Sequence, residues 1–218
     1  MKSRKISIRN LITEYKRRKP EIKNRLKDFR AVHKAGDEVI FKELCFCILT
    51  ANANALHCDK AINELTKEGL LLKGSAEDIK PLLRGRVRFH NKKAEFIACA
   101  RELFRKGNKV EIKKKLGLDN VFALRDWLVE NIKGYGYKEA SHFLRNIGLG
   151  RDIAILDRHI LKNLKRYGVI SKVPASVGSR KVYLEIEGRM RAFSGKTGIP
   201  LGDMDLLFWS IETGFVFK

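Results

Sequence analysis

The feature that most constrains the fold is a pair of helical patterns separated by a glycine turn, over residues 121–149. Apolar residues recur at steps of three and four on both sides of the turn: Val121, Leu124, Leu128 and Ile132 before it, and Ala140, Phe143, Leu144 and Ile147 after it. Asp119 and Asn120 are predicted to cap the first helix, and Gly148 and Gly150 to end the second. The unit is therefore predicted to be helix, tight turn, helix.

Gly134 and Gly136 stand two positions apart in this turn. A tight turn favours residues that tolerate positive φ, and a bare backbone lets another group approach closely. The first N–H groups of the helix that begins near Lys138 lack partners within that helix and lie at the positive end of its dipole, which suits a phosphate oxygen. A DNA backbone is one candidate ligand, although an ordinary turn between helices would use the same glycines.

Lys138 falls in the first turn of its helix, where the dipole disfavours an unpaired cation. A nucleophilic amine must be neutral, so this is a suitable place for one. Helical residues 138–149 carry the chain roughly 17 Å away from Lys138, and an extended return over residues 150–157 spans roughly 23 Å. Asp157 is thus expected to come back beside Lys138, and it also suits the N-cap of the helical run that follows it.

These residues resemble a known family. Gly134-Tyr-Gly136-Tyr-Lys138, with Asp157 nineteen positions after the lysine, is similar to the helix-hairpin-helix DNA glycosylase superfamily, whose bifunctional members carry lysine and aspartate at this separation. The string Gly-Tyr-Lys-Glu-Ala-Ser-His-Phe-Leu-Arg-Asn-Ile-Gly, with Leu-Asp-Arg-His-Ile-Leu after it, most resembles the compact archaeal and bacterial 8-oxoguanine DNA glycosylase/AP lyases. The resemblance covers nearly the whole chain and implies that Lys138 and Asp157 are catalytic.

The charge of the chain indicates a polyanionic partner. Lysine and arginine total 46 against 25 acidic residues, a net charge of +21, and the cations are spread along the whole sequence. An ion-paired surface of the thermophilic kind is the alternative, but many cations lack an acidic partner. Apolar residues make up 44% of the chain, which is enough for a core and excludes a disordered tail. Double-stranded DNA is the expected partner.

The cysteines and the absence of long apolar runs limit the other classes of protein. Cys45, Cys47, Cys58 and Cys99 have neither metal-ligand spacing nor the density of a disulfide scaffold, so we expect reduced and mostly buried thiols. No signal peptide or membrane-spanning run appears, so a cytoplasmic, nucleoid-associated monomer is expected. No cofactor or metal is predicted, although the family resemblance allows a monovalent cation held by carbonyls of the hairpin.

An all-α fold of two helical lobes is predicted, with the hairpin at the cleft between them. Residues 40–140 are assigned to one lobe, and residues 1–39 with 141–218 to the other, within a single unit of 218 residues. Residues 6–34 are expected to form two helices separated at Pro20. Further helices are predicted over residues 37–50, 56–68, 75–83, 92–106 and 201–213, together with one that carries Tyr183, Ile186, Met190 and Phe193 on one face.

Two stretches before the hairpin carry candidate DNA contacts. By family resemblance Asn52 is aligned with the amide that enters the duplex where the flipped base was. Arg84 and Arg86 belong to the densest basic stretch, which also contains Phe89. Phe89 is interpreted equally as a ring that stacks on an extruded base or as a core residue beside solvated cations. Arg158, which follows Asp157 directly, is a further DNA-binding candidate.

The C-terminal Phe-Val-Phe-Lys is too apolar to be free of the body of the protein, so its rings are expected to fix the terminus in place. The resemblance implies more, because the family's C-terminal lysine helps to distinguish 8-oxoguanine from guanine through its carboxylate. Lys218 matches that position, and Trp209 is a candidate wall of the base pocket or else plain core.

The predicted function is excision of 8-oxoguanine from duplex DNA through a lysine Schiff base, followed by cleavage of the strand by β-elimination. Two alternatives stay open at this point. One is a non-catalytic helix-hairpin-helix DNA-binding module, which explains the charge and the glycines but not the spacing of Lys138 and Asp157. The other is a glycosylase for a different damaged base.

Overall fold

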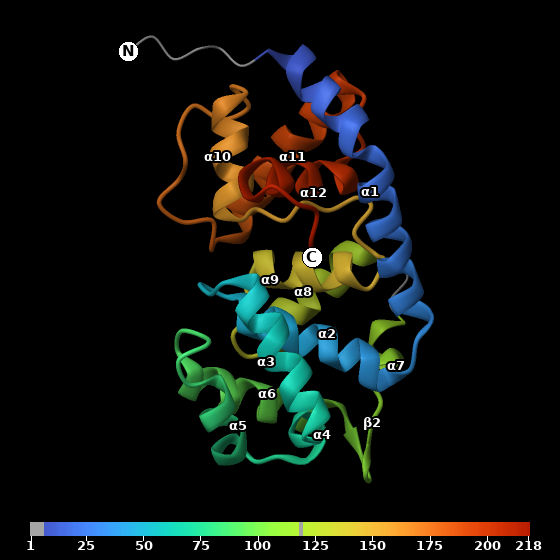
Figure 1. Ribbon diagram of the computed structural model, residues 1–218, viewed down its shortest axis with the longest axis vertical. Helices are drawn as coiled ribbons and strands as arrows, with labels where there is room; N and C mark the ends of the chain where they lie inside the picture. The colour runs from blue at the N-terminus through green and yellow to red at the C-terminus, as the bar shows by residue number, and fades with distance from the viewer. Residues whose placement is uncertain (1–6, 118–119) are drawn as a thin grey trace.

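The computed structural model describes residues 7–117 and 120–218, which are almost entirely helical (Figure 1). The helices are α1 (Ile8–Lys34), α2 (Asp37–Thr50), α3 (Ala55–Lys67), α4 (Leu70–Lys73), α5 (Ala76–Leu83), α6 (His90–Phe104), α7 (Lys113–Leu116), α8 (Val121–Asn131), α9 (Tyr137–Asn146), α10 (Arg158–Arg166), α11 (Arg180–Thr197) and α12 (Leu201–Thr213). Two short strands, β1 (Arg105–Lys106) and β2 (Lys109–Val110), pair antiparallel. The predicted all-α class is confirmed.

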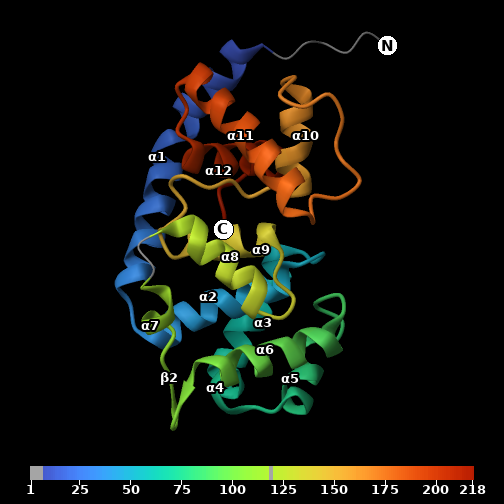
Figure 2. The ribbon, with the colours of Figure 1, turned by 180° about the vertical axis from the view of Figure 1, so that it is seen from behind.

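The helices form two lobes, each with its own apolar core. One core comes mainly from α2, α3, α5, α6, α8 and α9, and the other mainly from α1, α10, α11 and α12. Figure 2 shows α8 and α9 at the junction of the lobes, as predicted for the hairpin. The chain passes from the first core to the second between Ile153 and Ala154. The lobe limits drawn from the sequence near residues 40 and 140 stay predictions.

Local capping signals were read correctly. The Asn120 side chain accepts hydrogen bonds from the first amides of α8, and Ser75 forms a reciprocal capping box with Asp78 at the start of α5. Gly214 ends α12 with a φ of 96°. Asp119, the other predicted cap of α8, lies outside the described residues. The short helix α4 had no clear signal in the sequence.

The predicted break at Pro20 is wrong, because α1 runs without interruption through that residue. A proline removes one backbone donor and crowds the preceding turn, at a cost of roughly 3 kcal/mol in a helix interior. The buried residues Leu11, Tyr15, Ile22 and Phe29 lie on both sides of Pro20 and bury one face of the same helix. We attribute the continuity of α1 to this packing, which outweighs the local penalty.

The second helix of the hairpin ends three residues earlier than predicted, since α9 ends at Asn146. Gly148 then takes a φ of 81°, and a Cβ atom there would lie 2.8 Å from the Cα of Arg30 in α1. The amide of Leu149 closes the turn by donating to the carbonyl of Leu144 at 2.8 Å. Close approach of α1 thus requires glycine at this point.

Candidate active site

The hairpin places Lys138 in the first turn of α9. Gly134 has a φ of 85°, and a Cβ atom on it would lie 2.5 Å from the ring of Phe96, so this turn has no room for a side chain. Gly136 precedes α9, and its amide donates to the Glu139 carboxylate at 3.2 Å. The Gly136 amide, just before α9, is therefore not free to bind a phosphate, because it already donates to Glu139.

Lys138 is paired rather than isolated. Its Nζ lies 3.2 Å from Oε1 of Glu139, and its side chain keeps 21% of its exposure. The adjacent carboxylate therefore offsets the unfavourable position of a cation at a helix N-terminus. The arrangement leaves an amine that is accessible, lies at the junction of the lobes and has an acceptor for its proton beside it.

Asp157 is the N-cap of α10. Its Oδ1 accepts hydrogen bonds from the amides of His159 and Ile160, both at 2.8 Å. The N-cap interpretation made from the sequence is confirmed. Its carboxylate also contributes to a raised pKa at the buried Asp205, where burial is the main cause.

The C-terminal residue lies between the lobes (Figure 1). The Lys218 Nζ makes two ion pairs, with Oε1 of Glu43 and Oδ1 of Asp59, each at 2.9 Å, and lies 4.4 Å from the centre of the Phe46 ring. Burial opposes the charge, but the two carboxylates outweigh it and raise the pKa of the Lys218 amine above its ordinary value. The tail is docked, as predicted from its apolar character.

The rings of the tail pack as the sequence suggested. Trp209 packs against Phe215 and Phe217, with ring centroids 5.2 and 6.0 Å apart. Val216 belongs to the core formed mainly by α1, α10, α11 and α12, while Phe217 packs against the core of the other lobe. Trp209 thus supports the terminal segment directly.

His142 of α9 is close to both Lys138 and Lys218, and the sequence analysis did not single it out. Its buried ring packs edge-on against Phe46, with centroids 5.7 Å apart, and neither ring nitrogen has a hydrogen-bond partner within the described chain. Burial lowers the pKa of His142 well below its ordinary value, and nearby cations that include both lysines lower it further. Both effects favour the neutral imidazole.

Asn52 and Phe89 line one cavity of about 260 Å³ together with Lys93 and Gly134. Asn52 and Phe89 are the only non-glycine residues of the described chain with positive φ, at 53° and 57° respectively. Backbone strain of this kind clusters at functional sites. Phe89 is 58% exposed, so the interpretation of it as a core residue is wrong. It is the N-cap of α6 and lies at the surface.

Lys93 holds the turn that carries Asn52. Its buried Nζ donates to the carbonyls of Leu49 and Ala51 at the end of α2, both at 2.7 Å. These carbonyls lack partners within the helix, and a cation there also complements the helix dipole. The sequence placed Lys93 only in a basic stretch, and its partners lie more than 40 residues away, so nothing local predicts this role.

The three candidate arginines lie at the surface in different settings. Arg84 ends α5 and Arg158 begins α10, and both are exposed. Arg86 forms an ion pair with Glu64 of α3. Within residues 7–117 and 120–218, Arg86 is the one of the three that pairs with a carboxylate, so a phosphate would compete with Glu64 there.

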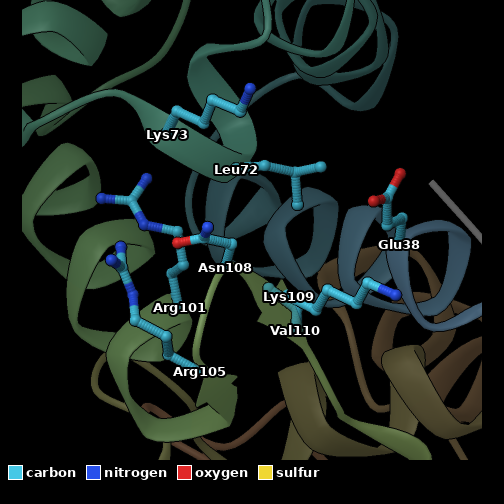
Figure 3. Close-up of a pocket in the computed structure, with 8 residues that line it drawn as sticks. All are labelled: Glu38, Leu72, Lys73, Arg101, Arg105, Asn108, Lys109 and Val110. Carbon is cyan, nitrogen blue, oxygen red and sulfur yellow. The ribbon is translucent and has the colours of Figure 1, made fainter.

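A second cavity, of about 440 Å³, lies at the end of the α2–α9 lobe away from the C-terminus (Figure 3). Lys73, Arg101, Arg105 and Lys109 make it basic, and it contains none of the predicted site residues. It is therefore separate from the hairpin and the tail.

The described residues contain neither a metal-ligand cluster nor a membrane-spanning helix. Within residues 7–117 and 120–218, no group of three or more histidine, cysteine, aspartate or glutamate residues is arranged to hold a metal ion. In the same part of the chain, no helix is both long and apolar enough to cross a membrane. Cys45, Cys47 and Cys58 are buried and Cys99 is exposed, all as free thiols.

Comparison with known proteins gives the family of the chain. Residues 22–199 match the family model of 8-oxoguanine DNA glycosylase. A relative from Fusobacterium nucleatum, named 8-oxoguanine DNA glycosylase/AP lyase, is 44% identical over 206 residues, which are 94% of each chain. The crystal structure of Methanocaldococcus jannaschii 8-oxoguanine DNA glycosylase superposes with a TM-score of 0.85 at 38% identity, over 97% of this chain and 95% of that one.

The same archaeal protein is also known in complex with a 15mer DNA containing 8-oxoguanine, and that structure matches with a TM-score of 0.85 at 37% identity, over 95% of this chain and 99% of that one. The similarity extends through both lobes, the hairpin with Lys138 and the segment that leads to Asp157. This chain belongs to the 8-oxoguanine DNA glycosylase family.

Proposed function

We propose that this protein excises 8-oxoguanine from duplex DNA and then cleaves the strand at the abasic site. The observation that carries the proposal is the position of Lys138, an accessible amine in the first turn after a glycine hairpin, in a chain whose relatives are named 8-oxoguanine DNA glycosylase/AP lyase. DNA is the partner, bound in part through the excess of 46 basic over 25 acidic residues.

The reaction begins with the damaged nucleotide turned out of the helix, because its glycosidic bond is inaccessible inside a duplex. The Lys138 amine attacks C1′ of the sugar in its neutral form, and the Glu139 carboxylate, 3.2 Å from its Nζ in the resting ion pair, is the nearest acceptor for the proton that the amine must lose. The bond from C1′ to the base breaks and the base leaves with the bonding electrons. The C1′–O4′ bond then breaks, O4′ takes up a proton, and a Schiff base between Lys138 and C1′ remains. Loss of a proton from C2′ and cleavage of the C3′–O bond, with the phosphate as leaving group, break the strand on the 3′ side.

Asp157 stabilises the positive charge that develops on the sugar and assists proton transfer. Its α10 capping bonds use only Oδ1, so Oδ2 is not committed to the cap. Asn52 is proposed to occupy the gap left by the flipped base, with Phe89 stacking beside it. Gly134, Gly136, Arg84, Arg86 and Arg158 are proposed DNA contacts.

Lys218 and Trp209 are proposed to recognise the base. The lysine side chain is fixed by Glu43 and Asp59, so the terminal carboxylate of the same residue is held between the lobes. The N1–H and N2–H₂ groups, which guanine and 8-oxoguanine share, can donate to a carboxylate, and the N7–H group is a donor that 8-oxoguanine has and guanine lacks.

Deleting Lys218 should reduce the preference for 8-oxoguanine over guanine by roughly tenfold or more, because the terminal carboxylate would withdraw from the base edge. The measurement is the ratio of single-turnover excision rates on duplexes that contain either base. Lys218→Met is measured in parallel: it keeps a carboxylate at position 218 but removes the two ion pairs that hold it, so a smaller loss of preference than in the deletion variant is expected. An unchanged ratio in the deletion variant would refute the role of the tail.

The proposed function is tested by borohydride trapping on a duplex that carries one 8-oxoguanine, with undamaged guanine and a preformed abasic site as parallel substrates. A covalent adduct with the lesion and with the abasic site is expected. An adduct with the abasic site alone would retain the lyase activity and would indicate a glycosylase for a different damaged base. Tight binding without any adduct would indicate a non-catalytic DNA-binding module.

Three further points belong to the same proposal. We expect the protein to act as a monomer, on DNA of the nucleoid in the cytoplasm. A monovalent cation would be held by main-chain carbonyls of the hairpin, and the positive φ of Gly134 supports a turn of the kind that exposes such carbonyls. No step of the reaction depends on this cation or on any other cofactor.

A further inference from the structure

Residues 153–156, in the segment between α9 and α10, are buried but irregular, so their backbone groups need specific partners. The amide of Ala154 donates to Oε1 of Glu187 at 2.7 Å, and the carbonyl of Ala154 accepts from the Tyr183 hydroxyl at 2.7 Å. The amide of Leu156, one residue before Asp157, donates to the same Tyr183 oxygen at 3.2 Å. Two side chains of α11 therefore fix the backbone that leads to Asp157.

The Tyr183 oxygen also contacts the helix that carries Lys138. It lies 3.3 Å from the hydroxyl of Ser141, which is three residues after Lys138 in α9. The Tyr183 hydroxyl has a single hydrogen to donate, and it donates this hydrogen to the carbonyl of Ala154. In the contact with Ser141, the serine hydroxyl is therefore the donor and the Tyr183 oxygen is the acceptor. One buried oxygen atom thus links the backbone before Asp157 to the helix of Lys138.

An ion pair extends this link to the first helix of the hairpin. The Arg125 guanidinium of α8 makes two bonds to the Glu187 carboxylate, at 2.7 and 3.0 Å, and both side chains are at most 2% exposed. Arg125 also donates to the Ser141 hydroxyl at 3.2 Å. The network therefore contacts both helices of the hairpin, the returning segment and α11.

Stability alone is a weak explanation for this pair. Replacing a buried ion pair with well-packed apolar residues is often neutral or stabilising, because removing two charges from water is costly. The pair offers directional hydrogen bonds that apolar packing lacks, since Glu187 also binds the Ala154 amide. Orientation of the segment is what these contacts provide beyond packing.

We propose that Tyr183 and Glu187 are positioning residues that set the carboxylate of Asp157 relative to the amine of Lys138. This inference rests on the catalytic roles given to those two residues under the proposed function. Neither Tyr183 nor Glu187 needs to touch DNA, since both are buried. They act on the geometry of the reacting groups and not on binding.

The test compares Tyr183→Phe with Tyr15→Phe. Each removes one buried hydroxyl and keeps the ring, but the Tyr15 hydroxyl bonds Asp203 at 2.7 Å and lies outside the network. Tyr183→Phe should lower the single-turnover excision rate by roughly tenfold to a hundredfold. Its affinity for a duplex with a non-cleavable abasic analogue should stay within about twofold of the parent protein, because binding groups are untouched. Tyr15→Phe should keep both values.

Equal excision rates in the two variants, at comparable melting temperatures, would overturn the inference. If Tyr183→Phe does not fold, the double variant Arg125→Met with Glu187→Met removes both buried charges together and frees only the half-exposed Arg191, and it should show the same loss of rate with retained affinity. An unchanged rate in that variant would also overturn the inference. Lys138→Gln is run in parallel, because an adduct formed by that variant would refute the proposed function itself rather than the positioning role.

Discussion

Lys138→Gln should abolish borohydride trapping on both the 8-oxoguanine duplex and the abasic duplex, with strand cleavage reduced by roughly a thousandfold or more. An amide nitrogen is not nucleophilic, whereas the glutamine side chain is similar in shape and can still donate to Glu139, so the hairpin should keep its fold. The covalent adduct is measured on a denaturing gel, together with DNA affinity at fixed salt.

Lys80→Gln is the matched control for this experiment. Lys80 lies in α5, outside the site, and like Lys138 it pairs with a carboxylate of its own helix, in this case Glu77. The control should trap DNA as the parent protein does. Retained adduct formation in Lys138→Gln would place the nucleophile on another amine.

Asp157→Asn should lower the single-turnover excision rate by roughly a hundredfold or more while leaving the melting temperature nearly unchanged. Asparagine caps a helix about as well as aspartate, so the bonds to the amides of His159 and Ile160 persist while the charge is lost. Asp157→Ala should lose both the rate and about 1 kcal/mol of the free energy of unfolding. The two variants thus separate the capping role from the catalytic one.

The measurements are quenched single-turnover kinetics and urea unfolding on the same preparations. Full activity in Asp157→Asn would show that the carboxylate serves only as a cap. Loss of stability in Asp157→Asn would show instead that its charge is needed for the fold, contrary to the capping geometry.

Features of the sequence that act locally were predicted well. The side-chain caps Ser75, Asn120 and Asp157 bond to amides two or three residues ahead, so the signal and the structure share one short stretch of chain. The same holds for the apolar periodicity of the hairpin helices. The prediction of a helix break at Pro20 was wrong, because the local penalty of proline is outweighed by the packing of α1 against helices distant in the sequence.

The surroundings of the site were not predictable in the same way. Lys218 was named by resemblance, but its partners Glu43 and Asp59 belong to α2 and α3, and nothing near the tail points to them. Glu43 had one local signal, as an acidic residue within a run of apolar positions. His142, Lys93 and Tyr183 acquire their surroundings only when helices far apart in the chain pack together.

Helix α1 constrains how the molecule can move when it takes up a flipped base. It is a single rod of about 40 Å that packs against α12 in one lobe and against α2 and α9 in the other. A continuous helix resists bending. Because α1 packs against both lobes, it restricts the movement of one lobe relative to the other. Room for the base must therefore come from side chains and the terminal segment, and the cost of accommodating it falls on local rearrangement.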